Sequence, residues 1–165
     1  MDIKQLFEWQ RELDGISKGR KGIYSEKVVE KKILALMVIL GEIANETCCC
    51  KQGVRHKVTS KGKVLDKYIE GLQYIISLGI DFGVDIETHD ENFLIVSCES
   101  LTVQFLHVYE ALIIVKVKKS HEMYKAALYT YFQLGKLLAF STKEIEKAYV
   151  HKKESIIKKR LVVVK

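Results

Sequence analysis

The chain contains no proline in 165 residues, and apolar side chains recur every three to four positions along most of it. Proline interrupts the interior of a helix, whereas this spacing gives a helix one continuous apolar face. Short linkers between the periodic segments favour antiparallel neighbours in a bundle. We therefore expect an all-α fold, a helical bundle of about six helices, at about 2–17, 26–49, 63–78, 101–117, 120–140 and from 141 onward.

Some of these helices carry signals for where they begin or end. The sequence STKE, Ser141 to Glu144, has the pattern of a capping box, in which the serine accepts from a helix N–H and the glutamate reaches back. Ser120 is a candidate N-cap for the helix before it, and Gly79 is a candidate C′ glycine for the third helix. Residues 83–98 include NFLIVS, which fits either a short strand or an extended loop.

Length and composition indicate one domain over residues 1–165, with a basic C-terminal tail from about residue 153. Hydrophobic residues make up 48% and charged residues 29%, which is typical of a globular protein. No run approaches the roughly 18 apolar residues of a membrane span, so no membrane partner is expected. Adjacent Cys48, Cys49 and Cys50 make a poor disulfide framework, and a helical pattern begins at the N-terminus, so we predict a cytoplasmic location.

The net charge of +6 is concentrated in two stretches, residues 51–67 and 151–165. Each contains six lysine or arginine residues and a single acidic residue. Local basic segments on a near-neutral chain suit a phosphate-bearing small ligand, or a solvated tail. Since no nucleic-acid-binding motif accompanies them, no nucleic-acid partner is expected.

Two helices each carry a pair of acidic residues four positions apart, Glu42 with Glu46 and Asp66 with Glu70. If these helices pack as antiparallel neighbours, the four carboxylates can converge across the seam. Oxygen ligands of this kind suit Mg²⁺, which binds phosphate oxygens and can assist attack of water on a phosphoanhydride. Acidic pairs at this spacing are also common on solvated helix faces, which is the simpler interpretation of the pattern.

Several blocks of the chain resemble one family closely. LFEWQRELD, KKILALMVILGEIANE, VLDKYIEGLQYIISLG, QFLHVYEAL and LLAFSTKEIEKAY are similar, in order, to the dimeric all-α dUTPase family of the all-α NTP pyrophosphohydrolase superfamily. The resemblance runs from about residue 6 to 152. It implies Mg²⁺-dependent hydrolysis of dUTP to dUMP and pyrophosphate, in a homodimer, with dUTP, dUDP or a related nucleotide as the ligand.

The resemblance also implies where the metal ligands should lie. The family holds its metals with an E-x-x-E pair on one helix and an E-x-x-D pair on the next. At those positions this chain has Ile39 and Glu42, then Lys67 and Glu70, so two of four are not acidic. We hypothesise that Lys67 takes the place of a metal by pairing with Glu42 or Glu70; the alternative is that it extends into water.

The expected site residues follow from the two acidic pairs and from matches to the family motifs. Two functions stay open at this point: a pyrophosphohydrolase of weak or altered activity, or a catalytically inactive homolog that acts as a dimeric nucleotide-binding or regulatory protein. The expected catalytic residues are Glu42, Glu46 and Glu70; the metal ligands are Glu42, Glu46, Asp66 and Glu70; the nucleotide-binding residues are Gln10, Lys51, Gln73, Tyr149 and Lys152.

Overall fold

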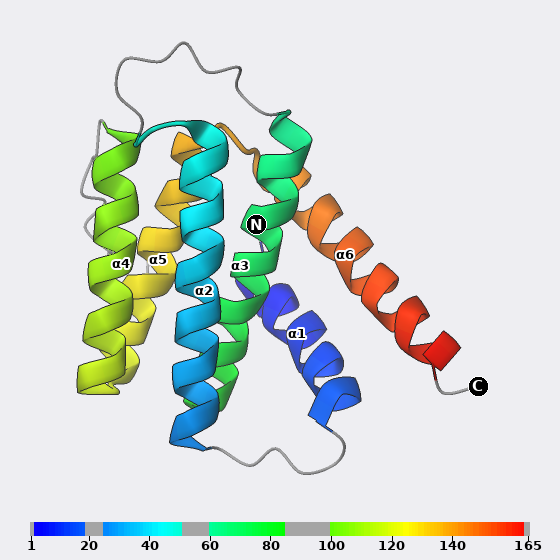
Figure 1. Cartoon of the computed structure of the whole chain (residues 1–165). Helices are drawn as coiled ribbons and strands as arrows, with labels where there is room; N and C mark the ends of the chain where they lie inside the picture. Colours follow the sequence, from blue (N-terminus) through cyan, green and yellow to red (C-terminus); the bar gives the residue numbers. More distant parts are fainter. Residues whose placement is uncertain (1, 19–24, 51–59, 85–99, 164–165) are drawn as a thin grey trace.

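The computed structural model describes residues 2–18, 25–50, 60–84 and 100–163. Within these ranges it contains six α-helices and no strand, which confirms the expected all-α fold (Figure 1). The helices are α1 (Ile3–Lys18), α2 (Glu26–Thr47), α3 (Lys61–Asp81), α4 (Leu101–Lys118), α5 (His121–Leu137) and α6 (Thr142–Val163).

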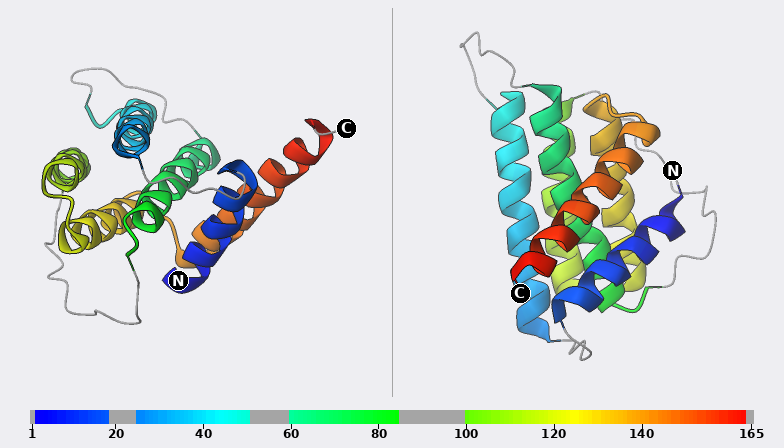
Figure 2. Two further views of the ribbon diagram at one scale, coloured as in Figure 1. Left: turned by 90° about the horizontal axis from the view of Figure 1, so that it is seen from below. Right: turned by 90° about the vertical axis from the view of Figure 1, so that its right-hand side faces the viewer.

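Four helices form the bundle and two lie across its side. α2 packs against α3 and α4, and α5 closes the bundle by packing against α3 and α4. α1 and α6 contact each other and both contact α3, so they cover one side of the bundle (Figure 2). α3 is therefore the central helix, and any site between α1, α3 and α6 rests on it.

The contact between α3 and α5 is made by two stacked tyrosines. The rings of Tyr68 and Tyr131 lie 4.9 Å apart, and each is fully buried. The Tyr131 hydroxyl donates to the carbonyl oxygen of Tyr68 at 2.8 Å, and the Tyr68 hydroxyl donates to that of Tyr131 at 3.4 Å. Burial raises the pKa of both phenols, so both remain neutral donors. The absence of a side chain at Gly71 leaves the space that the Tyr131 hydroxyl occupies.

Substitution of Gly71 by alanine should lower the free energy of unfolding by about 2–3 kcal/mol, although alanine is the better helix former. The new methyl group would overlap the Tyr131 hydroxyl and press on Leu36, and neither side chain has room to move. Gly62→Ala in the same helix is the matched control, because its methyl group would enter open space. Equal unfolding midpoints in urea for the two variants would contradict this account of the α3–α5 contact.

The helix ends confirm two of the three predicted signals. Glu144 Oε2 accepts from the Ser141 backbone N–H at 2.8 Å, and the Glu144 N–H donates to Ser141 Oγ at 3.2 Å, which completes the capping box. Ion pairing with Lys61 and the bonds from Ser141 lower the pKa of Glu144 to about 2. Ser120 caps α5 by accepting from the Met123 N–H at 3.2 Å.

The prediction that Gly79 ends the third helix is wrong. α3 continues to Asp81, and Gly79 lies inside it, buried against Tyr124. The Tyr124 hydroxyl donates to the carbonyl oxygen of Ile75 at 3.0 Å, an approach that a side chain at position 79 would block. The glycine is therefore needed for packing rather than for a turn.

Two predicted features lie outside the described residues. They are residues 85–98 of the segment 83–98, and Lys51. The basic C-terminal stretch predicted from about residue 153 is helical as far as Val163, as the continuation of α6. Cys48, Cys49 and Cys50 are free thiols. Among the described helices, none has the length and apolar composition needed to cross a membrane.

Candidate functional site

The predicted acidic residues of α2 and α3 lie on facing sides of the seam, but lysines lie among them. Lys67 forms an ion pair with Glu42, as one form of the sequence hypothesis required. Its hydrogen bond to Glu42, with the nearby charges of Glu70 and Asp66, raises the pKa of Lys67. The ammonium group is therefore firmly charged at neutral pH and lies between the two acidic pairs.

A second lysine reaches the same carboxylates from α6. Lys152 Nζ lies 2.9 Å from Asp66 Oδ1 and 3.5 Å from Glu70 Oε2. Glu46 and Asp66, with Lys63 and Lys67, line a shallow cavity of about 420 Å³ at the N-terminal end of α3. Three of the four acids are thus paired with two lysines, Glu42 with Lys67 and both Asp66 and Glu70 with Lys152.

The donor set does not fit a divalent cation in this arrangement. Ile39, at the position of an expected ligand, is 5% exposed and belongs to the hydrophobic core. Within the described ranges, no three or more histidine, cysteine, aspartate or glutamate side chains are grouped closely enough to hold a metal ion. A metal needs several oxygen ligands at one point, and here three of the four carboxylates are already ion-paired with ammonium groups.

A second cavity, of about 400 Å³, lies beside the acidic seam. It is bounded by α1, α3 and α6, with one residue from α2. It brings together three of the predicted nucleotide-binding residues, Gln10, Gln73 and Lys152, and one predicted catalytic residue, Glu70. The remaining residues that line it are Leu13, Asp14, Lys32, Tyr74, Ser77, Ile156 and Arg160.

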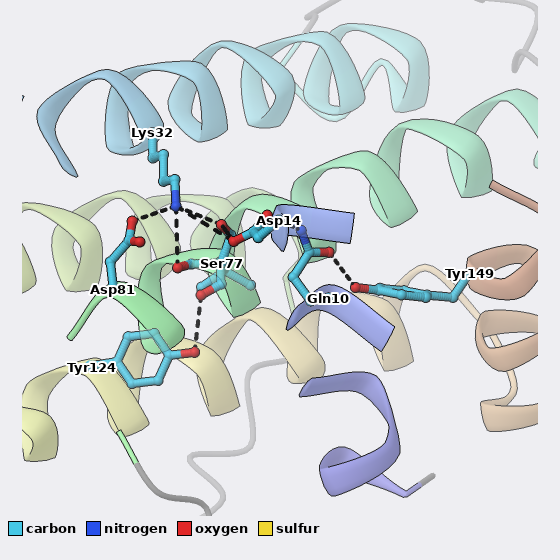
Figure 3. Close-up of polar contacts among 8 residues, drawn as sticks. Gln10, Asp14, Lys32, Ser77, Asp81, Tyr124 and Tyr149 are labelled. Carbon is cyan, nitrogen blue, oxygen red and sulfur yellow. Dashed lines mark hydrogen bonds and ion pairs between the residues drawn. The ribbon is translucent and has the colours of Figure 1, made fainter. Parts of the chain in front are cut away.

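A chain of polar contacts forms one wall of this cavity (Figure 3). The Tyr149 hydroxyl donates to Gln10 Oε1 at 2.6 Å, and Gln10 Nε2 donates to Asp14 Oδ1 at 2.9 Å. Asp14 Oδ2 accepts from Ser77 Oγ at 2.5 Å and lies 4.0 Å from Lys32 Nζ. These contacts fix the orientation of Gln10, so that its amide presents a defined surface to the cavity.

Lys32 lies at the end of this chain of contacts that is opposite Tyr149. Its ammonium group donates to Ser77 Oγ at 2.5 Å and to the carbonyl oxygen of Ser77 at 3.3 Å, and it forms an ion pair with Asp81. The side chains of Lys32, Asp14 and Asp81 are only 12%, 16% and 9% exposed. This is a buried ionic group that links α1, α2 and α3 directly behind the cavity.

Gln73 contributes the one buried polar side-chain atom that, among the described residues, has no hydrogen-bond partner. Gln73 is 8% exposed and lines the cavity, and its Nε2 is the unpartnered atom. Leaving a buried amide N–H unpaired costs about 1–3 kcal/mol, so native proteins rarely keep one without a reason. An acceptor on a bound ligand would satisfy it.

Sequence reasoning missed Asp14, Lys32, Ser77 and Asp81 as members of the site. Each had a partial signal: Asp14 follows Gln10 by four residues, and Asp81 follows Ser77 by four, so each pair shares a helix face. The signal for Lys32 was weaker, because it lies in the charged sequence EKKI and looks like part of a solvated face.

Comparison with known proteins identifies one family. A family profile described as dUTPase matches residues 2–161, nearly the whole chain. No curated protein and no solved structure matches the chain significantly.

Proposed function

We propose that this chain, which belongs to the all-α dUTPase family, binds a nucleotide in the cavity between α1, α3 and α6 and hydrolyses its phosphoanhydride weakly. Family membership supports a dUTPase-like function with a nucleotide substrate, and the family is generally dependent on divalent metals. The proposal adds that the metal site of this member is eroded and that its activity is therefore low or altered.

The observation that carries this proposal is the pairing of the expected ligands with lysines. Glu42 pairs with Lys67, while Asp66 and Glu70 pair with Lys152. A divalent ion would have to displace both ammonium groups. At an effective dielectric constant of 20, the repulsion between a divalent ion and one ammonium group 5 Å away is about 7 kcal/mol. Binding of the ion in the presence of the lysines is therefore strongly disfavoured.

The cavity residues have roles in binding that need no metal. Gln73 and Gln10 present amide groups to a base or sugar, and Tyr149 holds Gln10 in place. Burial raises the pKa of Tyr149, so its hydroxyl remains a donor to Gln10 across the physiological range. Lys152 and Arg160, two turns apart on α6, both line this cavity and supply positive charge near a phosphate.

Release of pyrophosphate from dUTP and dCTP, and of orthophosphate from dUDP, with Mg²⁺ or Mn²⁺, tests this function directly. We expect turnover well below the 1–10³ per second of ordinary enzymes. A rate within that range for dUTP would show that the lysines do not impair the site. Equilibrium dialysis with the same nucleotides measures binding independently of turnover.

A catalytically inactive homolog is the second candidate, and one observation favours it. Ile39 lies in the core, and three of the four acids, Glu42, Asp66 and Glu70, are ion-paired with lysines. Of these four acids, only Glu70 lines the cavity, where it could act as a base on water. Nucleotide binding with no detectable pyrophosphate release would select this candidate. Its role would then be binding or regulation, with the fold kept and the chemistry lost.

We also propose a homodimer, formed through the exposed faces of α2 and α4. These neighbouring helices carry large apolar side chains that are exposed, and an apolar face of this kind marks an interaction surface. The family is usually oligomeric. The side chains are Leu34 and Val38 on α2 and Val103, Leu106, Ile113, Ile114 and Val117 on α4.

The double variant Leu106→Glu/Ile113→Glu should be monomeric in sedimentation velocity at micromolar concentration, because two charges would be buried without partners in the interface. Ile16→Glu is the control, since Ile16 is also exposed but lies on α1. If the wild-type chain sediments as a monomer, the proposed homodimer is contradicted.

A further inference from the structure

We infer that Asp14 determines which base the cavity between α1, α3 and α6 accepts, by fixing the direction in which the side-chain amide of Gln10 faces. This deepens the proposed function and rests on it. Asp14 acts on the ligand through Gln10, so it is a positioning residue. Lys32 and Ser77, which bind Asp14 from behind, hold it for that role.

The direction of each hydrogen bond between Lys32 and Gln10 follows from the chemistry of the groups that take part (Figure 3). The ammonium group of Lys32 has donors only, so Ser77 Oγ accepts from it and has one proton of its own to donate. That proton goes to Asp14 Oδ2, because a carboxylate can only accept. Asp14 Oδ1 also requires a donor, and Gln10 Nε2 supplies it at 2.9 Å. The NH₂ group of Gln10 therefore faces Asp14.

Tyr149, on the other side of the Gln10 amide, does not impose a direction. Its hydroxyl donates to Gln10 Oε1 at 2.6 Å, but a hydroxyl can equally accept from an NH₂ group. If the amide turned over, Gln10 Oε1 would face Asp14 Oδ1, and two acceptors would meet with no proton between them. Asp14 and Tyr149 are the hydrogen-bond partners of Gln10 among the described residues, so Asp14 sets the direction.

Burial makes the reversed amide costly. Gln10 is 6% exposed, Ser77 is 4% exposed, and the side chain of Asp14 is 16% exposed. Water has little access to replace a lost hydrogen bond at such a place, and an unpaired buried donor or acceptor is strongly unfavourable. The amide of Gln10 is therefore held in one of its two orientations.

An amide held in one orientation can distinguish uracil from cytosine. Gln10 lines the cavity, and after bonding to Asp14 and Tyr149 it keeps one N–H and one oxygen lone pair for a ligand. Uracil presents a carbonyl acceptor beside its N3–H donor, whereas cytosine presents an amino donor beside its N3 acceptor. Donor and acceptor are thus exchanged between the two bases, so an amide that matches one opposes the other.

Two observations favour uracil as the matched base. The chain belongs to the dUTPase family. In addition, Gln73 Nε2 lines the same cavity and has no acceptor among the described residues. Uracil offers carbonyl oxygens at both of its polar ring positions, whereas cytosine has an amino group at one of them, so uracil is better able to supply that acceptor.

Titrations of the full chain with dUMP and dCMP measure this selection, because the two ligands share the sugar and the phosphate. Trp9 is the chain's one tryptophan, and its ring stacks on Tyr149 with 5.9 Å between centroids, so its fluorescence can report binding beside Gln10. Calorimetry checks the affinities. The wild type should bind dUMP at least about 10-fold more tightly than dCMP, since a mismatched base leaves buried groups unpaired.

The variant Asp14→Asn should reduce that preference to about 2-fold or less, because asparagine can turn either its oxygen or its NH₂ group towards Gln10. Asp81→Asn is the matched control. It removes the other buried carboxylate that pairs with Lys32, but Asp81 is not among the partners of Gln10. Asp81→Asn should keep the preference for dUMP, whatever its effect on stability. Equal loss of preference in the two variants, or no loss in Asp14→Asn, would overturn the inference.

The wild-type titrations separate this inference from the proposed function. If the wild type binds both nucleotides equally, or binds dCMP more tightly, the inference fails while nucleotide binding in the cavity stands. If it binds neither nucleotide, the proposed function and the inference both fail.

A measurement on the wild type covers the case in which Asp14→Asn does not fold. In ¹⁵N-labelled protein, the Gln10 Nε2 protons should show nuclear Overhauser contacts to the β-protons of Asp14. Contacts from these protons to the ring of Tyr149 instead would mean that the amide faces the other way, and would overturn the inference.

Discussion

Replacing Lys32 by methionine should lower the free energy of unfolding by about 3–5 kcal/mol. Methionine has a similar length but leaves Asp14 and Asp81 without the ammonium group that lies between them. Both carboxylates are more than four-fifths buried, and removing the ammonium group from a buried ionic group leaves their negative charges facing each other in a poorly solvated place. For a chain of this length, the loss corresponds to a fall in Tm of about 10 °C.

Lys31→Met is the matched control for that substitution. Lys31 precedes Lys32 in the same helix but is exposed, so its loss should change stability by less than about 0.5 kcal/mol. The double variant Lys32→Met/Asp81→Asn should recover part of the lost stability, because it removes one of the two buried carboxylate charges. If Lys32→Met and Lys31→Met unfold at the same temperature in calorimetry, the buried ionic group contributes no stability.

The double variant Ile39→Glu/Lys67→Glu should gain a response to Mg²⁺ that the wild-type chain lacks. It places an acid at each of the two positions where the family resemblance implies one and removes the ammonium group from Glu42. Without metal, the variant should be less stable by about 2–4 kcal/mol, because position 39 is buried in the core. With Mg²⁺ at 100 times its dissociation constant, binding should raise the variant's free energy of unfolding by about 2.7 kcal/mol.

Thermal unfolding in EDTA and in 10 mM Mg²⁺ measures that response. The wild-type midpoint should be the same in both, and the variant's midpoint should rise with Mg²⁺. The control variant is Ile39→Glu/Lys147→Glu, which keeps the buried glutamate but places the second negative charge on an exposed position of α6. Mg²⁺ should raise the unfolding midpoint of this control less than that of Ile39→Glu/Lys67→Glu. A wild-type chain stabilised by Mg²⁺ as strongly as the double variant would show that the lysines do not replace the metal.

The helices and part of the acidic seam could be predicted because their determinants are local. The capping box needs only Ser141 and Glu144, three residues apart, and it was confirmed. The pairing of Lys67 with Glu42 follows once two helices are placed side by side, and it too was confirmed. The roles of these residues in metal or nucleotide binding stay predictions.

The cavity could not be predicted, because it depends on contacts between distant parts of the chain. Lys32 and Asp81 are 49 positions apart, and Tyr149 and Gln10 are 139 apart. Gly79 is a residue whose role was predicted wrongly because a contact with a distant part of the chain decides it. A glycine near the end of a periodic segment resembles a helix terminator, and only the approach of Tyr124 from α5 shows why it lies inside α3.

The interlocked tyrosines fix the position of α3 against α5, so that α3 is held in place and α6 is the element that can move. Because the Tyr131 hydroxyl occupies the space beside Gly71, α3 can neither slide nor rotate against α5 without a clash. The carboxylates and amides that α3 contributes are therefore held in place by this packing. Lys152 and Lys153 of α6 pair with Asp66 and Glu70 on α3 and with Glu12 on α1 through partly exposed ion pairs, which are weak. We therefore expect α6, rather than α3, to make any rearrangement that admits or releases a ligand.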